Sequence, residues 1–220
     1  GSDGYEFIRC DKCLERAVDE YLSDREDHLL ITWKNATRMA ANALIRERLG
    51  HGGPLPDEGE PVLIKKNSEG FLNGEIVECR GFESGPQIDS VRTLWMTVRQ
   101  GTIERRLLVS IDGGPKDKGG EVFDGQMPWI ENWRNYHATL RVKCLPEPVP
   151  VTWGYCITAH SVQGSEARRA TVFLCRGDER NQNFRKLTTL PTGEQVPALA
   201  RWTYTAITRS KNRTTMIIGR

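Results

Sequence analysis

Residues 155–166 read YCITAHSVQGSE, and the organisation of the whole chain is best worked out from this stretch. It begins as an apolar run typical of a buried strand and turns polar where a helix could begin. Side chains that form hydrogen bonds gather at this junction, namely Thr158, His160, Ser161 and Gln163. In an α/β sheet such a junction lies outside the carboxyl ends of the strands, where ligands bind. Taken alone, the stretch is typical of an ordinary turn with a capping Ser or Thr. Whether it is a ligand-binding junction or such a turn depends on the rest of the sequence.

The bulk composition is that of an ordinary globular protein. The chain has 220 residues, enough for one large domain or two small ones. Hydrophobic residues make up 38% and charged residues 27%, and the net charge is +2. Nucleic-acid binding would therefore have to come from local clusters of Lys and Arg. No apolar run is long enough to cross a membrane and no signal-peptide pattern opens the chain, so we expect a cytoplasmic protein without a membrane partner.

The cysteines do not form a recognisable metal-binding pattern. The chain has six of them, at positions 10, 13, 79, 144, 156 and 175. Most lie in apolar stretches, which indicates reduced, partly buried thiols of an intracellular protein. Cys10 and Cys13 have a spacing found in metal and redox sites, but a zinc site needs a second pair of ligands. We predict no metal site, and the role of this pair stays open.

The N-terminal part of the chain has the pattern of an α/β unit. Residues 11–25 have apolar residues at helical spacing with charged residues between them, which predicts an amphipathic helix. Residues 29–33 form a short apolar run suited to a buried parallel strand. Asn35 is placed to cap a second helix over residues 36–49. The predicted apolar face of that helix comprises Met39, Ala40, Ala43 and Leu44. Its predicted polar side carries Arg38, Asn42, Arg46 and Arg48.

The pattern changes after the Gly/Pro/acidic loop at residues 51–60. Residues 61–67 are strand-like, and an Asn-Gly pair at 73–74 between apolar stretches is a strong hairpin signal. Residues 91–99 and 103–111 form two further strand candidates. Several short strands at this spacing are typical of a small barrel or sandwich.

The α/β pattern resumes near the C-terminal end. Residues 170–175 are a buried-strand candidate, residues 176–200 have the composition of an exposed loop, residues 201–213 could form a helix, and residues 215–219 form a last strand. The predicted fold class is therefore α/β, with a parallel-sheet domain built from both ends of the chain and interrupted by a small β-rich insert. An aromatic and basic segment at 129–145 either fills the core of the insert or stacks on bases.

Three segments together resemble the conserved motifs of superfamily 1 helicases. Residues 157–166, with the pattern Thr-x-His-x-x-Gln-Gly, resemble motif V, and residues 204–211 (YTAITRSK) look like motif VI. Residues 35–46 are similar to the motif IV region. The insert, which opens with residues 61–78, falls where the B subfamily of RecD-like and Dda-like enzymes carries an SH3-like 2B domain. The resemblance covers the chain from about residue 29 onward; motifs V and VI together are highly specific, and motif IV alone is weak.

The resemblance implies a particular domain organisation. The chain is similar to the C-terminal half of such a helicase, a UvrD-like C-terminal domain. Residues 1–58 and 148–220 would form the RecA-like motor lobe 2A. Residues 59–147 would form the SH3-like 2B insert.

The same resemblance assigns residues to the ATP cleft. Arg209 is expected to be the catalytic arginine that reaches the γ-phosphate when two lobes close, although a helix-end arginine in a surface ion pair would look the same in sequence. Gln163, Gly164 and Glu166 are expected to bind the nucleotide. Glu166 would accept a hydrogen bond from a ribose hydroxyl, and a first-turn glutamate facing the helix dipole is compatible with that role.

Four further residues are expected to contact nucleic acid. By the resemblance, Asn35, Thr158, His160 and Ser161 would face a single strand of DNA, where amide, hydroxyl and imidazole groups meet phosphates. None of these residues is expected to bind a metal ion.

A phosphate-binding loop requires Gly-Lys before a helix, and no Gly-Lys pair occurs in the chain. Asp178 and Glu179 follow a strand but are read as loop residues. We expect the first motor lobe, which would hold ATP and Mg²⁺, to lie outside these residues, in the same or a separate polypeptide. The expected function is the C-terminal part of an ATP-dependent DNA helicase with 5′-to-3′ translocation on single-stranded DNA, inactive without its N-terminal lobe. The alternative is a non-catalytic module that binds nucleic acid or protein, and an RNA track stays open.

Overall fold

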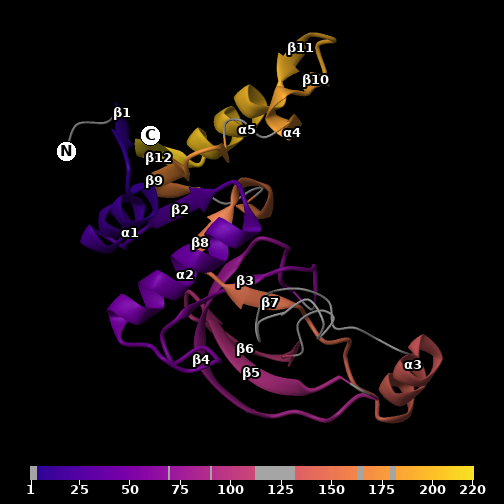
Figure 1. The fold of residues 1–220 in the computed structure, drawn as a ribbon. Coiled ribbons are helices and arrows are strands. Elements are labelled where there is room, and N and C mark those ends of the chain that lie inside the picture. The colour runs from indigo at the N-terminus through magenta and orange to yellow at the C-terminus, as the bar shows by residue number, and fades with distance from the viewer. Residues whose placement is uncertain (1–3, 69, 90, 112–131, 163–165, 179–181) are drawn as a thin grey trace. The chain divides into compact units, whose positions relative to one another are not determined.

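The computed structural model describes residues 4–68, 70–89, 91–111, 132–162, 166–178 and 182–220. The chain divides into two compact units, Gly1–Leu49 with Tyr155–Arg220 and Gly50–Gly154. The first unit has a parallel sheet and the second an antiparallel one (Figure 1), which confirms the predicted α/β fold class with a β-rich insert. Among the described residues, no helix combines the length and apolar character needed to cross a membrane.

The first unit is built on five strands that all run parallel, in the order β1-β12-β9-β2-β8. The strands are β1 (Gly4–Cys10), β2 (His28–Thr32), β8 (Cys156–Thr158), β9 (Ala167–Leu174) and β12 (Ser210–Gly219). Every residue of β2 is buried. Continuous apolar runs such as this are expected in parallel strands, because helices cover both faces of the sheet.

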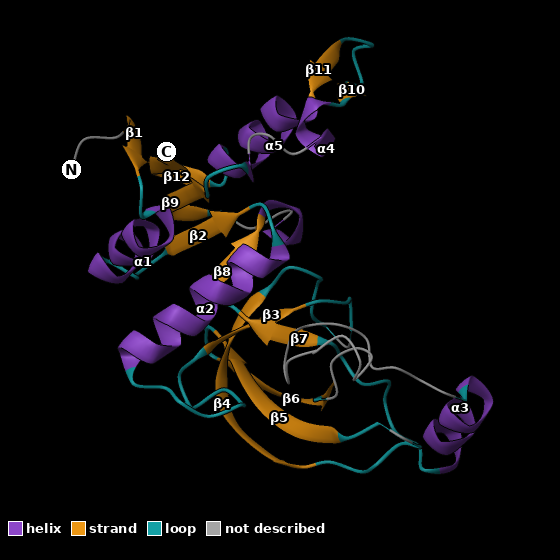
Figure 2. Cartoon of the chain, in the orientation of Figure 1, coloured by secondary structure: helices purple, strands orange, loops and turns teal. Residues whose placement is uncertain are grey.

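Helices α1 (Cys13–Ser23) and α2 (Asn35–Leu49) cover one face of this sheet (Figure 2). The shared core contains Ala17 and Val18 of α1, Ile45 of α2, and Leu30 and Phe173 of the sheet, all fully buried. The alternate strand residues, which point to the opposite face, are buried as well; they include Leu29, Ile31 and Val172. Strands β2, β8 and β9 are therefore shielded from water over most of both faces, whereas edge strand β1 is largely exposed.

Helix α2 forms as predicted, but the predicted apolar face is only partly correct: Leu44 and Leu49 are partly buried and pack against the core. Ala40 and Ala43 are exposed, whereas the buried positions are Arg38, Ala41, Asn42, Ile45 and Arg46. Ranking positions by hydrophobicity fails here because the buried face carries polar side chains that bond to the protein interior. Buried polar groups of this kind are stable only when they have hydrogen-bond partners.

Two other predictions for the first unit need correction. Residues 176–200 contain a short helix α4 (Gln182–Arg185) and a hairpin of β10 (Leu187–Thr189) and β11 (Gln195–Pro197), where a plain loop was expected. Phe184 of α4 is buried and lies against Trp202, which anchors this segment. The last helix, α5, spans Ala198–Ile207 and ends earlier than expected, since β12 already begins at Ser210.

The second unit is an antiparallel sheet in the order β6-β5-β4-β3-β7. Its strands are β3 (Pro61–Ile64), β4 (Ile76–Ser84), β5 (Thr93–Gln100), β6 (Ile103–Ser110) and β7 (Val151–Trp153). Just before β7, Val149 bridges to Val109 of β6, and its N–H donates to Leu108 O at 2.8 Å. The two edges of the sheet are therefore tied together, which curls the sheet around its core.

The turns and core of this unit follow from local sequence. The two predicted strands after residue 90 are β5 and β6, and Gly101 joins them with φ +60°, a conformation that favours glycine. Helix α3 (Trp133–Val142) places Tyr136 in a core cluster with Leu108 and Leu140. For Tyr136, the core interpretation of the aromatic segment is therefore correct.

Candidate functional site

The site begins at β8, which within the described residues has a neighbouring strand on one side only. The side chain of Asn42 takes the place of a second neighbour. Its Nδ2 donates to Cys156 O at 3.1 Å, and its Oδ1 accepts from Cys156 N at 2.7 Å. Asn42 is fully buried, so these two bonds satisfy backbone groups that water cannot reach. The strand that leads into Thr158 is thereby held in place by α2.

The segments after β2 and β8 leave the sheet side by side. Thr32 and Thr158 are register partners at the carboxyl ends of these two strands. As a result, the Trp33 and His160 rings lie 5.8 Å apart, centroid to centroid. Asn35, at the start of α2, belongs to the same end of the sheet, and both Asn35 and His160 are exposed.

Thr158 and Ser161 are held by each other. Their hydroxyl oxygens lie 3.0 Å apart, and both residues are buried. This contact spans the short 3₁₀ turn η2 (Ala159–Val162) and places His160 on its outer side. Of the four residues predicted to contact nucleic acid, His160 and Asn35 are exposed. Thr158 and Ser161 are buried, and their contact stabilises the turn.

An aromatic cluster at this end of the sheet was not anticipated from the sequence. Trp33 lies 4.1 Å from Phe184 and 5.8 Å from Trp202, measured between ring centroids. The indole N–H of Trp202 is buried without a hydrogen-bond partner among the described residues. The available signal was that Trp33 directly follows a buried strand, at the position where ligands bind in α/β sheets.

Glu166 and Arg209 lie together at the opposite end of the sheet. Glu166 directly precedes β9 and Arg209 directly precedes β12, and Ala167 N donates to Arg209 O at 2.9 Å. Arg209 Nε donates to Thr205 O at 3.0 Å. Lys211 Nζ lies 3.6 Å from Glu166 Oε2. Glu166 and Arg209, which lie far apart in the sequence, are thus brought to neighbouring strand starts at the amino end of the sheet.

The predicted site residues therefore fall into two groups. Thr158 pairs in register with Thr32 of β2, and Thr32 pairs with Phe173 of β9. Ala167, the residue after Glu166, begins β9 six residues before Phe173. At the strand rise of ~3.3 Å per residue, this offset amounts to about 20 Å. The residues expected to contact nucleic acid occupy the carboxyl end of the sheet and those expected to contact nucleotide the amino end. Gln163 and Gly164 lie outside the described residues.

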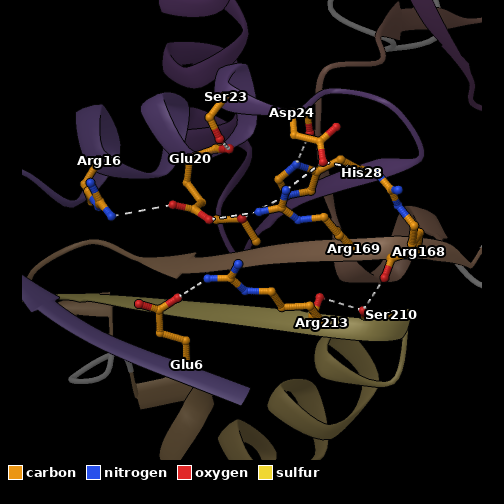
Figure 3. Close-up of polar contacts among 11 residues, drawn as sticks. Glu6, Arg16, Glu20, Ser23, Asp24, His28, Arg168, Arg169, Ser210 and Arg213 are labelled. Carbon is orange, nitrogen blue, oxygen red and sulfur yellow. Dashed lines mark hydrogen bonds and ion pairs between the residues drawn. The ribbon is translucent and has the colours of Figure 1, made fainter. Parts of the chain in front are cut away.

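A network of charged side chains braces the amino end of the sheet (Figure 3). Arg169 of β9 binds Glu20 at 3.1 Å and Asp24 at 2.8 Å, and Arg168 binds Asp24 at 3.0 Å. The hydrogen bond from Arg169 lowers the pKa of the Asp24 carboxyl. Ser210 Oγ donates to Arg168 O at 3.1 Å. The network ties the end of α1 to the strand starts that carry Glu166 and Arg209.

His28 extends this network into the interior. Its Nδ1 lies 2.8 Å from Asp24 O and its Nε2 2.9 Å from Thr171 Oγ1. A backbone carbonyl can only accept, so Nδ1 carries the proton and Nε2 accepts from the Thr171 hydroxyl in the neutral ring. Burial lowers the pKa of His28 and so favours the neutral form of this ring.

Three acidic residues, Asp178, Asp57 and Glu60, are engaged in structural contacts. Asp178, read as a loop residue, is buried; its Oδ1 lies 2.5 Å from Lys34 Nζ, and its Oδ2 accepts from Cys175 N at 2.9 Å. Within the described residues, His51, Asp57 and Glu60 are the one group of three possible metal ligands whose ligand atoms lie close together. His51 Nδ1 lies 2.8 Å from Asp57 Oδ2, and Glu60 accepts from Asp57 N. These contacts close the loop that leads into β3.

The fold resembles that of solved helicase structures. The Pif1 helicase from Bacteroides in complex with ADP-AlF3 and ssDNA is 13% identical, with a TM-score of 0.39, over 92% of this chain and 44% of that one. The Pif1 helicase from Candida albicans is 11% identical, with a TM-score of 0.40, over 93% and 52%. The chain thus spans about half the length of these helicases. No family model and no curated protein sequence matches it. Function is therefore inferred from the residues of this chain.

Proposed function

We propose that this chain is the C-terminal part of an ATP-dependent DNA helicase of superfamily 1, subfamily B. The observation that carries the proposal is the separation of two sets of side chains on one rigid sheet. Glu166 and Arg209 occupy the amino end, and Asn35 and His160 occupy the carboxyl end. A motor protein needs this separation, because ATP hydrolysis at one site must change the affinity for nucleic acid at the other site.

On the nucleotide side, Arg209 is the residue that would act on the reaction. Among the described residues only its Nε is engaged, so the terminal nitrogens of the guanidinium can bind an anion. A cation that meets the γ-phosphate when two lobes close stabilises the charge of phosphoryl transfer. Glu166, half-exposed, can accept a hydrogen bond from a ribose hydroxyl once Lys211 releases it. ATP with Mg²⁺ supplies the transferred phosphoryl group, and the metal would be held by the first lobe.

On the nucleic-acid side, the exposed groups suit a phosphate backbone. His160 and Asn35 offer an imidazole and an amide from adjacent segments. The Thr158–Ser161 hydroxyl pair fixes the turn that presents His160, and Asn42 fixes the strand before it. Because α2 carries both Asn35 and Asn42, a shift of this helix would move both groups together.

The two compact units support a two-part division of this kind, with an insert unit, Gly50–Gly154, that also contains Val149 and β7, beyond the expected residues 59–147. Residues 1–58 and 148–220 would form the RecA-like 2A lobe, and residues 59–147 the SH3-like 2B insert. The five-stranded sheet whose edges are tied through Val149 supports a small barrel in the insert. The partners of the chain are then single-stranded DNA and an N-terminal motor lobe.

The decisive variant is Arg209→Ala in the full-length protein. We expect hydrolysis of ATP to fall by about 10³-fold or more, as when an arginine finger is removed. Single-stranded DNA affinity should stay within about twofold, since Arg209 lies at the other end of the sheet. Arg201→Ala, an exposed arginine of α5, is the matched control and should change neither quantity. Equal loss of hydrolysis and DNA binding by Arg209→Ala would indicate a folding defect, and unchanged hydrolysis would refute the catalytic role.

The isolated chain gives a second test. Purified residues 1–220 should bind single-stranded DNA with an affinity that falls as salt rises, and should show no DNA-stimulated ATP turnover. ATP turnover by this chain alone would contradict the proposal that hydrolysis requires the N-terminal motor lobe. DNA binding by a full-length protein that never hydrolyses ATP would instead identify a non-catalytic module.

A further inference from the structure

Three of the six cysteines meet at the carboxyl end of the parallel sheet. Cys10 ends β1 and pairs in register with Gly219 of β12, while Cys175 directly follows β9, whose Leu174 pairs with the residue before Gly219. Cys10 and Cys175 thus sit on either side of Gly219. Both pack against the apolar cluster that contains Cys13, the first residue of α1.

Gly219 leaves room for this arrangement. A side-chain carbon at that position would lie 2.5 Å from Arg176 N, which is closer than such atoms can pack, and 3.1 Å from Cys175 C, which is a tight contact. The backbone around Cys175 therefore approaches β12 where no side chain stands in the way. The sulfur atoms of Cys13 and Cys175 lie 3.0 Å apart, although 162 positions separate the two residues.

The two thiols have different chemical roles. Cys13 opens a helix, and the helix N-terminus favours a thiolate. When Cys13 is ionised, the S–H of Cys175 can only donate to it, and this hydrogen bond lowers the pKa of Cys13. The same bond, with burial, raises the pKa of Cys175. Cys13 is therefore suited to be the nucleophile and Cys175 the partner that keeps its proton.

We propose that Cys13 and Cys175 form a redox-active pair that a hydroperoxide closes into a disulfide and an added dithiol reopens. A disulfide bond is about 2.05 Å long, so the sulfur atoms have only about 1 Å to move. The proposal adds a modification site to the chain and does not depend on the proposed helicase function.

The reaction balances with hydrogen peroxide as the oxidant. The Cys13 thiolate attacks one peroxide oxygen, the O–O bond breaks, and the departing hydroxide takes a proton to leave as water. The Cys175 sulfur then attacks Cys13 Sγ of the sulfenic acid; the S–S bond forms, the S–O bond breaks, and the Cys175 proton leaves in the second water. Two thiols and one peroxide give one disulfide and two waters.

The remaining cysteines serve as internal comparisons. Cys79 and Cys156 are buried, as Cys13 is, but burial raises the pKa of both thiols, whereas the hydrogen bond with Cys175 lowers the pKa of Cys13; Cys79 and Cys156 should therefore be the less reactive thiols. Cys144 is exposed, and its Sγ lies 3.7 Å from the backbone oxygen of Arg141. Cys10 is the alternative disulfide partner of Cys13, because the spacing of the two residues in the sequence is also found in redox pairs.

Peptide mapping of the wild-type chain tests the proposal without any variant. The chain is treated with hydrogen peroxide, blocked with an alkylating reagent and digested with trypsin without reduction. Trypsin cuts after Lys12, so Cys10 and Cys13 fall in different peptides, 10–12 and 13–16, and Cys175 falls in 170–176. We expect a linked species of peptides 13–16 and 170–176 that dithiothreitol abolishes. A 10–12 with 13–16 link, or sulfinic acid at Cys13 with no link, would overturn the proposal.

Variants assign the roles of the two thiols. In the wild type and in Cys144→Ser, the matched control, peroxide should remove two free thiols from the pair. In Cys175→Ser the Cys13 sulfenic acid should persist and be trapped by dimedone, and in Cys13→Ser neither link nor adduct should form at Cys175. Circular dichroism confirms that each variant is folded. A folded Cys13→Ser that still links Cys175 to Cys10 would refute Cys13 as the nucleophile.

Discussion

The side chain of Asn42 occupies the place of a neighbouring strand for Cys156. One amide group gives and receives a hydrogen bond at the same backbone position, at 3.1 and 2.7 Å, across 114 positions of sequence. In this way α2 closes the open edge of β8 just before the turn that carries His160. The relationship explains why a polar residue is fully buried on a helix whose apolar face was expected elsewhere.

Replacing Asn42 by Ala should therefore destabilise the first unit strongly. Two buried backbone groups of Cys156 would lose their partners, at about 1–3 kcal/mol each. We expect the free energy of unfolding to fall by about 2–4 kcal/mol in urea titration, with faster hydrogen exchange at Cys156. Ala43→Ser, on the exposed side of the same helix, is the control and should change stability little. Equal effects of the two substitutions would contradict the role of Asn42.

The stability of the chain should fall as the pH drops below about 6.5, the ordinary pKa of histidine. The pKa of His28 is lowered in the folded protein, so at intermediate pH the unfolded chain binds more protons than the folded one. The contribution of His28 to stability is then fully present above its unfolded pKa and is lost as the pH falls through its folded pKa. A tenfold weaker binding of the proton in the folded state corresponds to about 1.4 kcal/mol. In His28→Asn, urea titrations between about pH 7.5 and 5 should show a shallower decline; an identical decline would exclude His28 as its source.

The approach of β12 to the chain after β9 predicts a large effect at Gly219. The added carbon of Gly219→Ala would meet the backbone of Arg176 and Cys175, which can yield only by moving the strands. We expect a loss of about 1–3 kcal/mol in the free energy of unfolding, in the range of other overpacked sites. Gly4→Ala, where a new carbon has no atom within 4 Å, is the control. A wild-type melting temperature for Gly219→Ala would show that the two segments are not in close contact.

The exposed side chains at the carboxyl end of the sheet predict effects on nucleic-acid affinity. His160→Ala and Asn35→Ala should each weaken binding of single-stranded DNA by roughly three- to tenfold, the loss of about one hydrogen bond to a phosphate. Fluorescence anisotropy at fixed salt measures this change. Arg201→Ala again serves as the control. Unchanged affinity in both variants would place the nucleic acid on another surface.

Local sequence patterns were sufficient for much of the first unit. The apolar runs of β2, β9 and β12 require no knowledge of their neighbours, since burial on both faces leaves a continuous hydrophobic signal. The turn at Gly101 between β5 and β6 has its own chemistry as well. Strand β1 was missed, because most of its residues are exposed at the edge of the sheet and carry no burial pattern.

Contacts between distant residues could not be foreseen in this way. The candidate residues in the two segments that resemble motifs V and VI could be named from their order along the chain, but their division between two ends of one sheet follows from parallel pairing. Asn42 with Cys156, and Cys13 with Cys175, meet only because strands far apart in sequence lie next to each other. Periodicity reports whether a residue faces water or the interior; which atom it meets there depends on strand order and register, which no local pattern encodes.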